Sequence, residues 1–269
     1  MTPRFRFTLF LLARLILLAS PAASQVRVLH REGTLHGFLA LRTTEGEVLA
    51  SGDLVQSGRG NRVTARLTFH FKDGSLYDET SIFTQDRTFR LLSDHLVQKG
   101  PSFPHPVDVF TDTTKGQLIV RSTSDGKEQV KTEHITLPPN LSNGIVSMLL
   151  KNVRPEDDEI ELSMVVATPK PRLIKLAITR HAEDLFAVAG SKRKATHFVV
   201  KFEIGGIAGA VAPLIGKQPP DTSVWIADGE TPVFIKSEGP LYADGPIWRI
   251  ELTSPVWPED IKDKEKHAQ

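Results

Sequence analysis

The residues best suited to metal binding or acid–base catalysis are nine histidines spread along the chain. No two of them stand in a His-Glu-x-x-His or His-x-His arrangement, the spacings that bring two imidazoles to one metal ion. His36, His70 and His197 fall on the polar faces of expected strands, where contact with solvent is their ordinary environment. We therefore expect no metal ligands and no cofactor.

Nucleophilic catalysis has equally little support in the sequence. The chain contains no cysteine, which excludes a thiol nucleophile, thiolate metal sites and disulfides. It also lacks the Gly-x-Ser-x-Gly turn of many serine hydrolases. A Ser/His/Asp trio assembled from distant segments leaves no local pattern, so a hydrolase with a dispersed site stays as an alternative. The expectation is a protein that is not an enzyme and has no catalytic residues.

Two charged runs have simple explanations. The four acids at 156–159 lack the alternating spacing and the turn glycine of a calcium loop, so we expect a solvated turn. Ser191, Lys192, Arg193 and Lys194 are expected to form a basic turn at the tip of a hairpin.

The first 24 residues have the composition of an export signal. Arg4 and Arg6 precede an apolar run from Leu9 to Ala19, and small residues follow at 20–24. Retention of this segment as a membrane anchor is the alternative to cleavage. Without a cysteine near the cleavage site, the chain cannot be a lipoprotein. We expect a periplasmic or secreted protein.

The mature chain is close to neutral. The full sequence has a formal charge of +1, and removing 1–24 removes three arginines and no acids, which leaves −2. This charge gives no electrostatic reason to expect nucleic acid as a partner. No later apolar run is long enough for a membrane span.

Short segments with strand character follow one another through the mature chain, separated by turn residues. Arg62–Phe71 shows the clearest alternation, with an apolar face that includes Val63, Leu67 and Phe69. The expected strands are Thr34–Arg42, Glu47–Val55, Arg62–Phe71, Ser75–Phe83, Thr88–Gln98, Val107–Thr111, Gln117–Thr123, Glu128–Leu137, Glu159–Thr168, Arg172–Arg180 with an extension to Gly190, Thr196–Ile204, Val224–Ala227, Val233–Glu238 and Ile247–Thr253.

One helix is expected, within Pro138–Val153. Leu141, Ile145, Met148 and Leu149 are spaced as one face of an α-helix of about three turns. Such a helix is not stable alone and must pack against the sheet. It either fills the core or acts as a lid over a cavity.

These elements predict a mainly β fold: a large curved antiparallel sheet, a half-barrel or open barrel, with one main helix packed in its concavity. Residues 25–258 would form a single domain, and the charged segment 259–269 a flexible tail. Residues on the inner face that would line a ligand cavity are Val63, Leu67, Phe69, Ile145, Leu149, Phe198, Val200 and Phe202.

The most unusual segment is Gly205 to Gly216, which is apolar and rich in glycine and alanine. One interpretation is a close-packed crossover, in which glycines allow backbones to approach. The other is a mobile flap at a cavity mouth, which would add Ile207, Val211 and Leu214 to the ligand-binding set.

Three parts of the chain carry a resemblance to known proteins: 143–144 with 148–152 of the expected helix, the strand 224–228 with 232–234, and the segment 205–217. In these parts the chain resembles the half-barrel of the periplasmic lipoprotein carriers LolA and LolB, and more closely the uncharacterised exported bacterial families thought to share that architecture. The resemblance implies an apolar concavity. It does not imply lipoprotein transfer, because this chain is longer than the carriers and has a single expected helix.

Two functions follow as expectations. The first is a non-enzymatic periplasmic protein that binds or carries a lipid or another apolar ligand in its concavity. The alternative is a structural cell-envelope protein that has a filled core, takes no small-molecule ligand and binds a protein partner.

Overall fold

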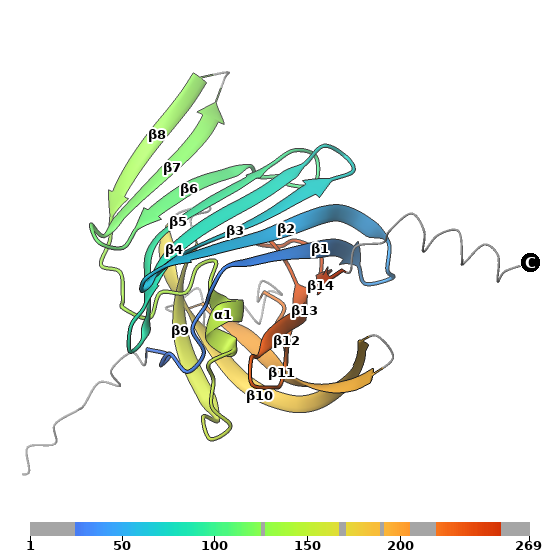
Figure 1. The fold of residues 1–269 in the computed structure, drawn as a ribbon. Coiled ribbons are helices and arrows are strands. Elements are labelled where there is room, and N and C mark those ends of the chain that lie inside the picture. The colour runs from blue at the N-terminus through green and yellow to red at the C-terminus, as the bar shows by residue number, and fades with distance from the viewer. Residues whose placement is uncertain (1–24, 125–126, 167–170, 189–190, 205–218, 254–269) are drawn as a thin grey trace, which may run out of the picture.

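A computed structural model describes residues 25–124, 127–166, 171–188, 191–204 and 219–253. The described residues form one antiparallel sheet and one short helix (Figure 1). The elements are β1 Leu35–Thr43, β2 Val48–Arg59, β3 Arg62–Phe71, β4 Leu76–Gln85, β5 Phe89–Lys99, β6 Val107–Asp112, β7 Gln117–Ser124, β8 Lys127–His134, α1 Val146–Leu150, β9 Glu159–Val166, β10 Arg172–Val188, β11 Ser191–Glu203, β12 Thr222–Ala227, β13 Val233–Gly239 and β14 Trp248–Leu252.

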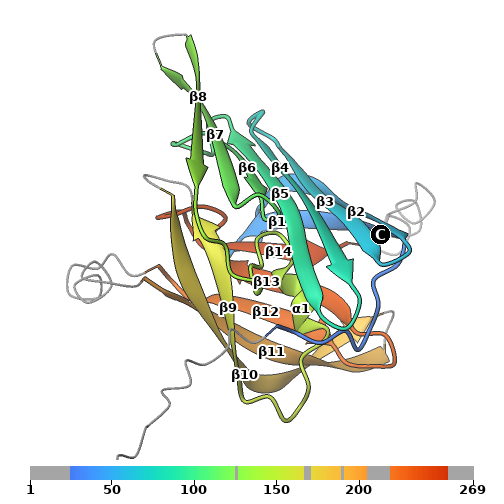
Figure 2. The same ribbon diagram turned by 90° about the vertical axis from the view of Figure 1, so that its left-hand side faces the viewer.

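The sheet is two meanders joined by a pair of strands from opposite ends of the described chain. Strands β1 to β8 follow one another in one half and β9 to β14 in the other, and β1 pairs with β14 between them. Leu39 lies opposite Leu252 and Leu41 opposite Ile250 at this seam. The edge strands are β8 and β9, so the sheet curls without closing (Figure 2). The expected mainly β, antiparallel, open architecture is confirmed.

Alternation along each strand decides which side chains face the interior. On β3, Val63 and Phe69 have no exposed surface, whereas Arg62 and Arg66 on the opposite face are exposed. Phe69 lies across the neighbouring strand, where any side chain at Gly52 would overlap its ring. The hairpin after β3 turns at Gly74, whose φ of +84° suits glycine.

The helix is much shorter than the sequence predicts. The expectation of one main helix within Pro138–Val153 is wrong: α1 has five residues, Val146–Leu150. Residues before it instead form turns and a bridge to β9, where Leu141 pairs with Ser163. The burial that the apolar spacing predicts is found, since Leu141, Ile145, Met148 and Leu149 are all at most 3 % exposed. Apolar residues at this spacing indicate that one side of the segment is buried. They do not show that the whole segment has helical hydrogen bonds.

The interior holds two apolar clusters. One surrounds α1 and includes Val63, Phe83, Phe198 and Val200. The other is aromatic and packs Phe69, Phe71, Tyr77, Phe103 and Trp248. The inward face of β4 connects them, because Tyr77 belongs to the second cluster and Phe83 to the first. Glu79 and Ser81 lie between them on the same face of β4, while Leu54 and Phe234 pack against both clusters.

Strand β10 follows the expected extension of Arg172–Arg180 and ends at Val188, whereas β11 begins earlier than expected. β11 begins at Ser191, so the residues expected to form a basic turn, 191–194, are paired with Leu185 to Val188 of β10. Irregular pairing near Arg180 and Ala182 marks the point where β10 continues into this extension. The expected signal segment, the tail 259–269 and the glycine-rich segment 205–216 lie outside the described residues.

Candidate functional site

The structure brings most of the expected ligand-binding residues together around α1. Val63, Ile145, Leu149, Phe198 and Val200 belong to one buried cluster, and Phe202 packs against it. Phe69 and Leu67 lie in the neighbouring aromatic cluster. These side chains therefore contact one another or other core residues. The three remaining members of the set, Ile207, Val211 and Leu214, lie outside the described residues.

The segment before α1 is fixed to β9 by reciprocal hydrogen bonds. The Asn143 side chain donates from Nδ2 to the Val165 carbonyl oxygen and accepts from the Val165 amide at Oδ1, both at 2.9 Å. Ser142 donates its amide and its hydroxyl to the Ser163 carbonyl oxygen. These bonds continue the sheet through side chains and hold α1 against its inner face.

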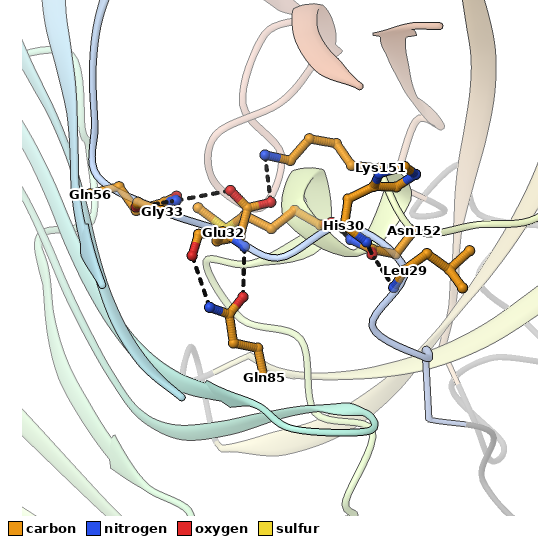
Figure 3. Close-up of polar contacts among 9 residues, drawn as sticks. Leu29, His30, Glu32, Gly33, Gln56, Gln85, Lys151 and Asn152 are labelled. Atoms are coloured by element: carbon orange, nitrogen blue, oxygen red, sulfur yellow. Dashed lines mark hydrogen bonds and ion pairs between the residues drawn. The ribbon is translucent and has the colours of Figure 1, made fainter. Parts of the chain in front are cut away.

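The end of α1 is fixed to the N-terminal segment in the same manner. Asn152 Oδ1 accepts hydrogen bonds from the amides of Leu29 and His30 at 2.8 and 2.7 Å (Figure 3). Its Nδ2 donates to the Met148 carbonyl oxygen, which satisfies one of the free carbonyl groups at the helix end. The helix is therefore attached to the described chain on both sides.

A buried ion pair lies beside this attachment. Lys151 Nζ is 2.5 Å from Glu32 Oε1, and the two side chains are 14 % and 6 % exposed. Gln56 Nε2 donates to Glu32 Oε2 at 2.8 Å, and Gln85 bonds the backbone amide and carbonyl of Glu32 (Figure 3). A buried ion pair is retained at least cost when its remaining polar positions are bonded in this way. Gln56 Oε1 is the one atom of this group that is buried without a partner.

A second polar group inside the sheet contains two carboxyl groups, and no cationic side chain of the described residues bonds either of them. Asp94 is 3 % exposed, and Glu79 on the adjacent strand is half-buried. Ser81 Oγ donates to Asp94 Oδ1 at 2.7 Å, and Tyr77 donates its hydroxyl to Glu79 Oε2 at 2.7 Å. We call Tyr77, Glu79, Ser81 and Asp94 the acid layer.

Burial decides the protonation of the acid layer. It raises the pKa of the Asp94 carboxyl well above its usual range, and the nearby Glu79 charge adds to this effect. Burial also raises the pKa of Glu79, against the hydrogen bond from Tyr77 that lowers it. Burial raises the pKa of the Tyr77 phenol, and the negative charge of Glu79 raises it further. Ionising both Asp94 and Glu79 would bury two negative charges without a cation bonded to them. At least one of the two carboxyl groups is therefore favoured in its protonated form.

The backbone that leads into α1 lies directly against the acid layer. A Cβ atom at Gly144 would overlap Ser81 Oγ and would lie 2.8 Å from Asp94 Oδ1 and 3.1 Å from Glu79 Cδ. Gly144 also has a φ of +66°. Both carboxyl groups therefore approach one backbone position, and that position accepts only glycine without rearrangement.

The acid layer can exchange protons at a higher pH than ordinary carboxyl groups, because the pKa values of both of its acids are raised. The described residues place no histidine or cationic side chain in hydrogen-bond contact with either acid, and they contain no group of three or more acidic, histidine or cysteine side chains that could hold a metal ion.

Sequence reasoning missed the acid layer and the Glu32–Lys151 pair. A signal for the first was present: Tyr77, Glu79, Ser81 and Phe83 share one face of a strand by simple alternation. No comparable signal existed for the second, because Glu32 and Lys151 lie in irregular or helix-end segments far apart in sequence.

The outer face carries a separate cluster on β10, β11, β12 and β13. His197 stacks on Trp225 with 4.3 Å between ring centroids, and Lys236 Nζ lies 3.9 Å from the Trp225 centroid. Trp225 Nε1 donates to Asp184 Oδ2 at 2.6 Å. Burial lowers the pKa of His197 from its ordinary value, and its buried Nε2 has no hydrogen-bond partner among the described residues. A pocket of about 390 Å³ adjoins the cluster, lined by Asp184, Leu185, Phe186, Ala195, Trp225, Ile235 and Lys236.

Comparisons with known proteins limit what can be inferred from similarity. No protein-family model matches the chain, and no curated protein matches it. Among solved structures, a β-barrel-like protein of the domain of unknown function DUF1849 from Brucella abortus is similar at 12 % identity. The match covers 86 % of this chain and 99 % of that chain with a TM-score of 0.46. In the part of the chain that the structure describes, no helix has the length and apolarity needed to cross a membrane.

Proposed function

We propose that this chain is an exported, non-enzymatic envelope protein that acts through its outer surface on a protein partner. The observation that supports this proposal is the occupation of the sheet's inner face by the protein's own residues 141–150. The side chains that a carrier would offer to an acyl chain are used for this contact. Val63, Phe198 and Val200, for example, are each at most 3 % exposed.

A lipid in this position would have to displace α1. Displacement breaks the hydrogen bonds of Asn143 and Asn152 and exposes the apolar cluster to water. Each buried hydrogen bond that is lost without replacement costs about 1–3 kcal/mol. The apolar surface of the helix contributes further, at roughly 25 cal/mol per Å². A filled interior is therefore the state that the described contacts favour.

The outer face offers apolar surface that the core does not need. Phe38 on β1 is 45 % exposed and Val55 on β2 is 47 % exposed. His36 lies opposite Val55 in the strand register, and its ring centroid is 4.6 Å from that of Phe38. Exposed aromatic and branched side chains that gather on one face are typical of protein contact surfaces.

Two measurements test this function, one on protein purified from a bacterial periplasm and one in intact cell envelopes. Native mass spectrometry followed by organic extraction should give the mass of the polypeptide alone. Crosslinking in intact envelopes should capture a partner, and Phe38→Ser should abolish the crosslink, whereas the conservative interior variant Leu149→Met should retain it. A lipid that is recovered reproducibly in the extract, or a crosslink that is lost only in Leu149→Met, would contradict the proposal.

A further inference from the structure

Strand β8 is an edge of the sheet with an accessible backbone. It pairs with β7 on one side, and no described strand pairs with it on the other. The β7–β8 hairpin extends beyond the neighbouring strands in both views (Figures 1 and 2). Val130 at its centre is 59 % exposed. A strand of this kind can be extended by pairing with another strand.

The register with β7 shows which backbone groups of β8 are free. The Ile135 amide donates to the Gly116 carbonyl oxygen at 2.9 Å, just beyond the last strand pair, Gln117 with His134. Hydrogen-bonded residues alternate along an antiparallel strand, so the odd-numbered residues of β8 are the ones bonded to β7. The N–H and C=O groups of residues 128, 130 and 132 therefore point to the open edge.

The charges of β8 match a second copy of the same strand. In an antiparallel pair centred on Val130, each Val130 lies opposite the other, and Lys127 of each copy lies opposite Glu133 of the other. This register pairs residues 128 and 132, so the free backbone groups meet. The smallest shift that keeps the free backbone groups opposite one another moves one strand by two residues. It places Lys131 opposite Lys131 in one direction and Lys127 opposite Lys131 in the other. Charge repulsion thus disfavours both neighbouring registers.

We propose that β8 is a homodimer interface, through which two copies of this chain pair edge to edge about a two-fold axis at Val130. Charged residues on an edge strand often prevent association. Here their order along the strand makes the edge complementary to itself, as a two-fold interface requires. The contact is small, so the dimer is expected to be weak and to form at high local concentration. This inference does not depend on the proposed partner-binding function, which uses a different surface.

Sedimentation equilibrium of the mature protein up to about 1 mM tests the proposal over the range of weak affinities. The wild type should form dimers. Lys127→Glu and Glu133→Lys should each raise the dissociation constant by about tenfold or more, because each places like charges opposite one another twice. An equimolar mixture of these two variants should dimerise again, because the carboxylate introduced at position 127 of one chain then faces the ammonium group introduced at position 133 of the other.

A backbone variant supplies an independent measurement. Val130→Pro removes an N–H that faces the open edge and leaves the ladder to β7 intact, so the variant should melt near the wild-type temperature but remain monomeric. If Val130→Pro fails to fold, the mixed charge variants still decide the question. A monomeric wild type throughout the concentration range would overturn the proposal, as would a mixture that dimerises no better than its separate components. Phe38→Ser should leave self-association unchanged, which separates this result from the test of partner binding.

Discussion

The interior of this sheet contains two polar groups that differ in whether a buried carboxyl group is paired with a cation. Glu32 is paired with Lys151 and bonded by Gln56 and Gln85. Asp94 and Glu79 accept hydrogen bonds from Ser81 and Tyr77, but no cationic side chain of the described residues bonds them. Both groups are covered by the same short segment, since Gly144 lies against the acids and Lys151 follows the helix. We call this segment, residues 141–151, the plug.

The difference shows how the plug can be held by two kinds of polar contact. At the end of α1, an ion pair binds a cation of the plug to an anion of the N-terminal segment. At its start, the plug places the backbone of Gly144 against the acids, and burial raises the pKa values of both carboxyl groups. The contact at the end of α1 requires the charges of both Glu32 and Lys151. The contact at the start of the plug is favoured when one of the two carboxyl groups, Asp94 or Glu79, is protonated and neutral.

Removing the cation of the ion pair should have the largest effect. Lys151→Met leaves Glu32 buried without its counter-ion, and we expect the free energy of unfolding to fall by about 3–5 kcal/mol. Urea denaturation at neutral pH measures this change. The double variant Glu32→Gln/Lys151→Met removes both charges and should recover most of the loss. A single variant within about 1 kcal/mol of the wild type would show that the pair does not hold the plug.

Gly144→Ala should be the next most damaging change. The added methyl group would overlap Ser81 Oγ, and the positive φ disfavours any side chain. We expect a loss of about 2–4 kcal/mol in thermal or chemical unfolding. Gly60→Ala is the matched control, because Gly60 has a φ of +64° with open space around it. Equal losses in the two variants would mean that strain alone, without contact to the acid layer, accounts for the effect.

Asp94→Asn should change how stability depends on pH. Because folding raises the pKa of Asp94, the folded state binds more protons than the unfolded state between the two pKa values. The contribution of Asp94 to stability should therefore be fully present below the usual carboxyl pKa of about 4 and be lost as pH rises towards the raised value. Denaturation at a series of pH values should show a smaller slope for Asp94→Asn across this window. An unchanged slope would exclude Asp94 as the titrating group.

The smallest effect is expected on the outer face. Arg66 bonds Asp78 through two nitrogens, but Arg66 is 57 % exposed, so solvent and salt weaken the pair. Arg66→Ala should lower the free energy of unfolding by no more than about 1 kcal/mol. A loss comparable to that of Lys151→Met would show that burial does not distinguish the two ion pairs.

The strands and their inward faces were predictable because alternation is a local property. Val63, Phe69, Phe198 and Val200 are buried as the period of two requires. The length of the helix was not predictable. The apolar spacing from Leu141 to Leu149 indicates that one side of this segment is buried, but not that all of it is helical. Over its first part, hydrogen bonds from the side chains of Ser142 and Asn143 to β9 take the place of helical hydrogen bonds.

Spacing between near neighbours along the chain was enough to predict antiparallel strands and the apolar side of the plug, and the number of strands was enough to predict that the sheet curls. The three-dimensional fold was needed to show that Glu32 meets Lys151, that Glu79 and Asp94 meet without a bonded cation, and that β8 remains an edge. Charged residues separated by long stretches of chain carry no pattern that identifies their partners. Their pairing is set by the register of the strands and by the path of the loops between them.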